Sequence, residues 1–253
     1  MIGFFDLGCT AEQLAWVKDR VDVIRQPEWE FEFPGRDEAP QHLKGLIARP
    51  FLPRYFPDFE IYFWIDADAW VQDWRAVELY LQGSALKGLA ITPEVDRGSR
   101  IQYGGLPKYW QWSFNHYYAT YGAQEAEKYQ SYPMLNAGVF ALHRAAPQWH
   151  LWAKHLQQGL QRSSSLYTDQ MALNLAVYID SFEQTEMLPA WCNWACHFGL
   201  PIWDQQRHLL VEPYVPHTPI GIVHLTEIKH ECLELPTTQQ GRAAVRMQYT
   251  SRG

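Results

Sequence analysis

The sequence predicts an α/β fold with a mostly parallel central sheet flanked by helices. Short apolar runs of strand length alternate with segments of helical pattern along most of the chain. Hydrophobic residues make up 47% of the 253 residues and charged residues 19%, so a sizeable core is available. We find no internal repeat and no clear linker. We therefore expect one domain over residues 1–236, followed by a polar, loosely held tail over residues 237–253.

The first part of the chain has the pattern of a strand, a helix and a second strand. The apolar run at 2–6 predicts a strand, and Thr10 with Gln13 forms the pattern of a capping box that opens a helix over 11–20. A second short strand is predicted over 21–24. After a loop over 26–40, residues 42–56 have a helical pattern that Pro50 and Pro53 should interrupt.

The remaining elements continue this alternation. Thr168 is expected to cap the helix that begins at Asp169. Segments 93–108 and 191–208 have the composition of irregular loops. Further helices are predicted over 74–81, 109–121, 147–160 and 169–178. Further strands are predicted to end at Asp66 and to run over 88–92, 136–143, 184–188, 209–211 and 220–224.

The most informative segment runs from Glu60 to Val71, where an aromatic and apolar run stops at Asp66 and Asp68. The run is too short to span a membrane and is typical of a buried strand. Residues two apart on an extended chain project to the same side, so the two carboxylates can face one point at the end of a strand. Oxygen ligands of this kind suit Mg²⁺ or Mn²⁺ beside a phosphate. The alternative is an ordinary turn with a capping aspartate.

Charge and cysteine content exclude some classes. A net charge of -7 argues against a nucleic-acid-binding protein. The four cysteines, Cys9, Cys192, Cys196 and Cys232, do not form a dense disulfide pattern, and buried free thiols are favoured over a zinc site. No signal peptide and no long apolar span is visible, so we expect a soluble, cytoplasmic protein without a membrane span.

Three later segments carry polar residues that could join the aspartate pair. Asn136, Ala137 and Gly138 open a strand with small residues that let a ligand approach the backbone. Asp169 and Gln170 lie in the first turn of a helix, where the helix dipole alone favours an acid. His224 ends an apolar run and has a lysine, Lys229, shortly after it; a lone histidine in such a run is more often a core residue.

The order of these segments resembles glycosyltransferase family eight and its close relatives, which have the GT-A fold. The resemblance covers residues 3–230 and is judged from the order and spacing of the motifs. It implies that a divalent ion, Mn²⁺ or Mg²⁺, bridges the diphosphate of a nucleotide sugar. The implied roles are as follows: metal ligands Asp66, Asp68 and His224; donor contacts Asp66, Asn136, Ala137, Gly138, Lys229 and Lys44; catalytic residues Asp169 and Gln170 beside the reacting carbon.

Two features depart from the family pattern. The family places a glycine three residues and a lysine about six residues after its late histidine, whereas this chain has Glu227 and Lys229. Family members also begin with a strand and loop that hold the nucleotide base, and that segment would precede Ile2. We therefore expect a chain that lacks the first strand, because it is truncated or its start at Met1 is misassigned.

The function implied by the resemblance is transfer of a sugar from a nucleotide-sugar donor, UDP-linked, with retention of configuration, to an unknown glycan or other acceptor. One alternative is an inactive transferase relative or a carbohydrate-binding protein. Another is a metal-dependent phosphoesterase, which should show more clusters of Asp and His than this chain does.

Overall fold

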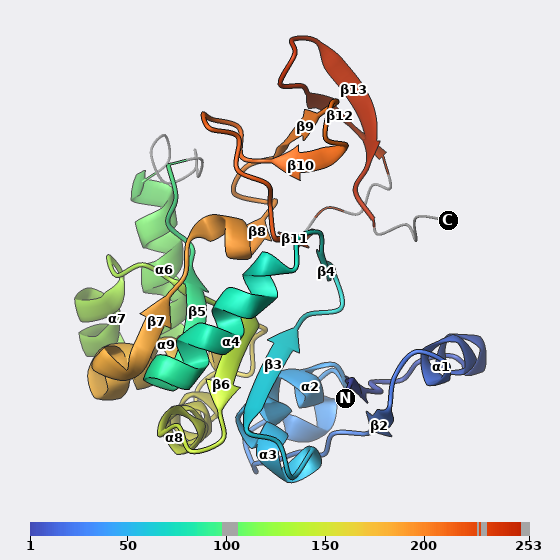
Figure 1. Cartoon of the computed structure of the whole chain (residues 1–253). Helices are drawn as coiled ribbons and strands as arrows, with labels where there is room; N and C mark the ends of the chain where they lie inside the picture. The colour runs from blue at the N-terminus through green and yellow to red at the C-terminus, as the bar shows by residue number, and fades with distance from the viewer. Residues whose placement is uncertain (98–105, 227, 229–231, 249–253) are drawn as a thin grey trace. The chain divides into compact units, whose positions relative to one another are not determined.

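The computed structural model describes residues 1–97, 106–226, 228 and 232–248 (Figure 1). It confirms a mixed α/β protein with several sheets. The chain forms two compact units, and each is described by itself. The first unit comprises Met1–Tyr62, Ser113–Gln130 and His143–Glu183, and the second comprises Phe63–Trp112, Ser131–Leu142 and Gln184–Gly253.

The first unit opens with a β–α–β arrangement. Strands β1 (Gly3–Phe5) and β2 (Val23–Arg25) pair in parallel, and helix α1 (Ala11–Lys18) connects them. The predicted capping box is present: the Thr10 hydroxyl accepts from the Gln13 backbone N–H at 3.2 Å, and the Gln13 side chain accepts from the Thr10 N–H at 2.8 Å. These two bonds satisfy backbone donors that the first helical turn leaves open.

Two prolines divide the next helical segment, as the sequence predicts. Pro50 and Pro53 lack the backbone N–H that a continuous helix needs, so the segment breaks into short pieces. The pieces are α2 (Leu43–Ala48), η2 (Arg49–Phe51) and α3 (Leu52–Tyr55). A short 3-10 helix, η1 (Arg36–Glu38), lies in the predicted loop before this segment.

Helices form the rest of the first unit, with α8 packed against α9 and Trp152 fully buried. The predicted cap at Thr168 is wrong: Tyr167 is the N-cap residue, and the Thr168 hydroxyl donates to the Ser163 carbonyl at 3.0 Å. The elements are α6 (Leu106–Tyr121, whose first residues belong to the second unit), α7 (Ala123–Tyr129), α8 (Gln148–Leu160), α9 (Thr168–Leu175), the π-helical η3 (Ala176–Ser181) and η4 (Phe182–Gln184).

A four-stranded sheet has the order β3-β6-β5-β7. Strand β5 pairs antiparallel with β6 and parallel with β7, so the expected mostly parallel sheet is not shown. Helix α4 (Arg75–Lys87) packs against β5 and β7. In β3, only Tyr62 is buried, so this strand is less buried than its composition predicts. The strands are β3 (Ile61–Ile65), β5 (Leu89–Pro93), β6 (Leu135–His143) and β7 (Thr185–Met187).

Smaller sheets complete the second unit, including strands in the segment 191–208 that was expected to be irregular. Strands β4, β11 and β8 form one sheet in that order, β9 pairs with β10, and β12 pairs with β13. The elements are β4 (Ala69–Val71), η5 (Ala190–Cys192), β8 (Trp194–Ala195), β9 (Ile202–Asp204), β10 (Leu209–Val211), β11 (Ile222–His224), β12 (Cys232–Pro236) and β13 (Arg242–Arg246).

The segment after Thr237 is not loosely held as far as residue 248. Strand β13 pairs antiparallel with β12 along five residues. Val245 is 6% exposed and Met247 is fully buried, in a cluster with Trp194 and Leu210. The sparse apolar residues of this segment fall at alternate positions, which puts them on one face of the hairpin. The domain boundary at residue 236 stays a prediction. Among the described residues, no helix is both long and apolar enough to cross a membrane.

Candidate metal centre

Two aspartates and a histidine converge in the second unit. Asp66, Asp68 and His224 each offer one ligand atom, and these three atoms lie within 4.8 Å of one another. Within the part of the chain that the structure describes, this is the one such group of His, Cys, Asp or Glu side chains. The aspartates were expected on one side of an extended strand. They lie instead in the turn between β3 and β4, where the Ala69 N–H donates to the Asp66 carbonyl at 3.0 Å.

Strand pairing explains how a histidine so distant in the sequence reaches this turn. Strand β11 runs antiparallel to β4, and His224 lies opposite Ala69, the residue that follows Asp68. The Leu225 N–H then donates to the Asp68 carbonyl at 2.9 Å. His224 therefore ends its strand beside the aspartate turn, in accord with the predicted strand end.

The cluster has the donor atoms that a hard or borderline divalent cation prefers. The Asp66 carboxylate accepts from the Trp64 indole N–H at 2.6 Å, which fixes its orientation. The Asp68 side chain is 46% exposed, and its Oδ1 lies 3.3 Å from Nε2 of the buried His224. Two carboxylates and an imidazole suit Mn²⁺ or Mg²⁺, and the exposed side leaves room for further oxygen ligands. The residues therefore fit a divalent cation.

Gly138 allows this close packing. A β-carbon at this position would lie 2.4 Å from Cε1 of His224 and 2.9 Å from Oδ2 of Asp66, closer than real contacts allow. Its carbonyl also accepts from the Asp66 N–H at 2.8 Å. The sequence predicted that a small residue here lets a ligand approach the backbone; in the structure, side chains of the cluster approach it.

A chain of buried amides holds the histidine from behind. His224 Nδ1 lies 3.0 Å from Oδ1 of Asn193, and the Asn193 amide donates to Oδ1 of Asn136 at 3.0 Å. The Asn136 amide in turn donates to Glu94 at 2.7 Å. Neither Asn193 nor Glu94 was predicted from the sequence. Asn193 lies between Cys192 and Cys196, which were considered only as zinc ligands. Glu94 directly follows the end of β5, and its place at a strand end could have indicated a site residue.

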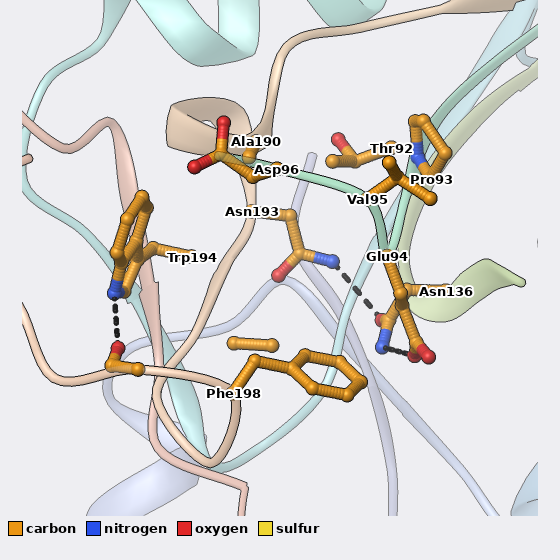
Figure 2. A pocket seen from close by; sticks show the side chains of 12 residues that line it. Thr92, Pro93, Glu94, Val95, Asp96, Asn136, Ala190, Asn193, Trp194 and Phe198 are labelled. Atoms are coloured by element: carbon orange, nitrogen blue, oxygen red, sulfur yellow. Dashed lines mark hydrogen bonds between the residues drawn. The ribbon is translucent and has the colours of Figure 1, made fainter. Parts of the chain in front are cut away.

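A pocket opens beside this amide chain (Figure 2). Its lining combines carboxylates, amides and aromatic rings. The Tyr214 hydroxyl donates to one of these carboxylates, Asp96. Asn136 lines this pocket, whereas Ala137 and Gly138 are not among its lining residues. These residues are Thr92, Pro93, Glu94, Val95, Asp96, Asn136, Ala190, Asn193, Trp194, Ala195, Phe198 and Gly199.

The predicted catalytic pair lies in the first unit, at the start of α9. Asp169 is 3% exposed and accepts from Nη1 of Arg49 at 2.7 Å; the Arg49 side chain is 4% exposed. The Asp169 carbonyl accepts from the Trp152 indole at 2.8 Å, and the Gln170 carbonyl accepts from Asn174. Burial, followed by the Asp169 charge, raises the pKa of Tyr121. The catalytic role of Asp169 and Gln170 stays a prediction. Arg49 was not predicted as a site residue, because the sequence around it shows only a helix interrupted by prolines.

The remaining predicted cations and thiols can be placed as follows. Lys44 is half-buried in the first unit, with Nζ 5.4 Å from the ring centroid of Trp29. Lys229 lies outside the described residues. Cys192 and Cys196 are buried free thiols, and burial raises the pKa of each to about 12. A thiol with that pKa is a poor metal ligand at neutral pH, because zinc binds the thiolate.

Comparison with known proteins gives little support for any family. No family model and no curated protein matches the sequence. One similar solved structure is the apo structure of the bifunctional glycosyltransferase WbbM, with 14% identity and a TM-score of 0.37. The match covers 76% of this chain and 30% of that chain. At this TM-score, the likeness decides neither the fold nor the function.

Proposed function

We propose that this protein is a metal-dependent glycosyltransferase with a GT-A-like fold that uses a nucleotide-sugar donor, UDP-linked. The observation that carries the proposal is the convergence of Asp66, Asp68 and His224 on one point, with one side open to solvent. In the proposal, these three residues hold Mn²⁺ or Mg²⁺.

Each residue of the cluster has a physical role in this reaction. Cleavage of the bond between the sugar and the phosphate leaves negative charge on the departing diphosphate, and a bound cation stabilises that charge where it develops. The two aspartates would hold this cation. The Trp64 indole fixes the carboxylate of Asp66, and the carboxylate of Asp68 is exposed to solvent. Lys44 and Lys229 are proposed as further contacts of the donor.

The sugar end of the donor is the second part of the proposal. Asn136, Ala137 and Gly138 are assigned to the donor sugar, and Asn136 lines the pocket of Figure 2. Asp169 and Gln170 are assigned to the reacting carbon, where oxygen atoms stabilise oxocarbenium-like charge. Arg49 balances the charge of Asp169 before any substrate binds. Retention of configuration belongs to the same proposal.

The test is a thermal-shift screen of UDP-sugars with and without Mn²⁺, followed by donor hydrolysis. We expect Mn²⁺ alone to raise the melting temperature and a UDP-sugar together with Mn²⁺ to raise it further, because ligand binding to the native state stabilises it by mass action. Asp68→Ala should abolish both the shift and the hydrolysis. The matched control is Asp37→Ala, which removes a carboxylate that is 80% exposed and pairs with Arg36 at the surface. Wild-type hydrolysis without Mn²⁺, or unchanged hydrolysis in Asp68→Ala, would contradict the proposal.

A second function, glycan binding without turnover, is favoured by the composition of the pocket alone. Glu94 and Asp96 supply acceptors for sugar hydroxyls, and Phe198 supplies an aromatic face. This function predicts glycan binding that does not depend on metal and survives Asp68→Ala. A phosphoesterase would hydrolyse simple phosphate esters; the described residues contain one acidic metal group rather than the larger clusters of a two-metal site.

A further inference from the structure

We propose that Asn193 is a positioning residue that places the proton of His224 on Nδ1 and thereby leaves Nε2 free to bind the cation. The part about the cation rests on the proposed function, whereas the position of the proton does not. The four side chains involved, those of Glu94, Asn136, Asn193 and His224, are each between 4% and 8% exposed.

The direction of the hydrogen bonds is set at the far end of the chain of amides. The Gly138 backbone N–H can only donate, and it lies 2.9 Å from Oδ1 of Asn136. An ionised Glu94 can only accept, and it faces Nδ2 of Asn136 at 2.7 Å. These two partners fix which end of the Asn136 amide is oxygen and which is nitrogen.

The orientation of Asn136 then fixes the orientation of the Asn193 amide, and the Asn193 amide fixes the position of the proton on His224. Because Oδ1 of Asn136 is an acceptor, the group of Asn193 that faces it at 3.0 Å must be its NH₂. The other end of the Asn193 amide, Oδ1, therefore faces Nδ1 of His224 at 3.0 Å. An oxygen acceptor in this place requires a proton on Nδ1.

A neutral imidazole with its proton on Nδ1 has its lone pair on Nε2. That nitrogen lies 3.3 Å from Oδ1 of Asp68, so two acceptors face one another. A cation between them satisfies both atoms. A hydrogen-bond partner behind a metal-binding histidine that fixes its tautomer is a common arrangement, and its loss lowers metal affinity about tenfold to a hundredfold.

The first experiment reads the proton without any metal. Imidazole ¹⁵N chemical shifts are measured by NMR on metal-free protein labelled at histidine, at about pH 8.5, where an imidazole of ordinary pKa is neutral. His224→Gln assigns the signals of His224 by their disappearance. We expect the proton on Nδ1. A proton on Nε2 in the wild-type protein would overturn the proposal whatever the variants do.

The second experiment measures Mn²⁺ affinity by titration calorimetry in folded variants. Asn193→Leu keeps the size of the side chain and removes its oxygen, and we expect Mn²⁺ binding to weaken by tenfold or more. Asn193→Gln keeps an amide whose oxygen can face Nδ1 and whose NH₂ can face Asn136, so its affinity should return to within about threefold of the wild type. The matched control, Asn174→Leu, removes a fully buried amide in the first unit and should change the affinity less than twofold.

The outcomes separate this inference from the proposed function. Weak Mn²⁺ binding by the wild-type protein, or no effect of Asp68→Ala, would end the proposed function and leave the NMR result to decide the position of the proton. Binding that requires Asp68 but is unchanged in Asn193→Leu would overturn the positioning role alone. Equal binding by Asn193→Leu and Asn193→Gln would show that Asn193 only fills space.

Discussion

The aspartate turn and the start of α9 present carboxylates in opposite ways. Asp169 is buried and paired with Arg49 at 2.7 Å, so its charge is balanced inside the protein. Asp66 is half-buried and Asp68 is exposed, and each offers a carboxylate oxygen within 4.8 Å of a nitrogen of His224. The sequence suggested a functional role for all three aspartates. The proposed function places an external cation at Asp66 and Asp68, whereas Arg49 lies beside Asp169.

Mutations can separate acids that support the fold from acids that are proposed to bind a cation. A buried ion pair is costly to break because one partner keeps its charge without water. Two neighbouring carboxylates at the surface repel one another, so the removal of one should cost little stability. Stability and Mn²⁺ binding should therefore respond to mutations of the two regions in opposite ways.

The largest expected effect is on stability, at the buried pair. Arg49→Met should lower the free energy of unfolding by about 3–5 kcal/mol, because Asp169 is left with an unbalanced charge. The double variant Arg49→Met/Asp169→Leu should recover most of this loss. Urea unfolding of the three proteins measures it. Equal stability of Arg49→Met and the wild type would mean that Arg49 does not balance the charge of Asp169.

A smaller effect is expected where the cluster is most crowded. Gly138→Ala would place a β-carbon 2.4 Å from His224, so the histidine and Asp66 must move. We expect a loss of about 1–3 kcal/mol of stability and also weaker Mn²⁺ binding, by about tenfold or more.

Gly159→Ala is the matched control in the first unit. Its new β-carbon would lie 2.7 Å from Thr120, so it is also overcrowded, yet Mn²⁺ affinity should not change. Calorimetry on both variants distinguishes a local effect from general destabilisation. If both glycine variants bind Mn²⁺ equally well, the close packing around Gly138 has no bearing on the cluster.

The smallest expected effect concerns a third kind of carboxylate, which is held by backbone N–H groups. Bonds from Cys9 and Gly8 lower the pKa of Asp6, and bonds from Arg207 lower the pKa of Asp204. A group whose pKa is lower in the folded state adds stability above its unfolded pKa, about 3.9, and loses it as the pH falls through the folded value. Asp204→Asn should therefore flatten the fall in stability below about pH 4. An unchanged slope in acid unfolding curves would count against this assignment.

The sequence predicted elements whose signals are local. The capping box at Thr10, the proline breaks at Pro50 and Pro53, and the alternation of strands and helices all reappear in the structure. It did not predict the short strands β4, β8 and β12, because each is stabilised by partners distant in the chain rather than by its own composition. Sheet direction was missed for the same reason.

The candidate site shows the same limit. The aspartate pair and His224 were chosen from the ends of apolar runs, which a sequence displays directly. Arg49 and Asn193 were missed because their importance lies in contacts with distant residues. Arg49 contacts Asp169, 120 positions away, and Asn193 contacts His224, 31 positions away. A sequence shows which side chains could bind a ligand or take part in a reaction. Contacts across the fold, such as Arg49 with Asp169, decide which of them are paired inside the protein.

The most direct measurement is anomalous X-ray diffraction from crystals soaked in Mn²⁺. We predict one strong peak within coordination distance of Asp66, Asp68 and His224, and no such peak in crystals of Asp68→Ala. A wild-type map with no peak at this cluster, at a Mn²⁺ concentration that loads other manganese proteins, would contradict the proposed metal site.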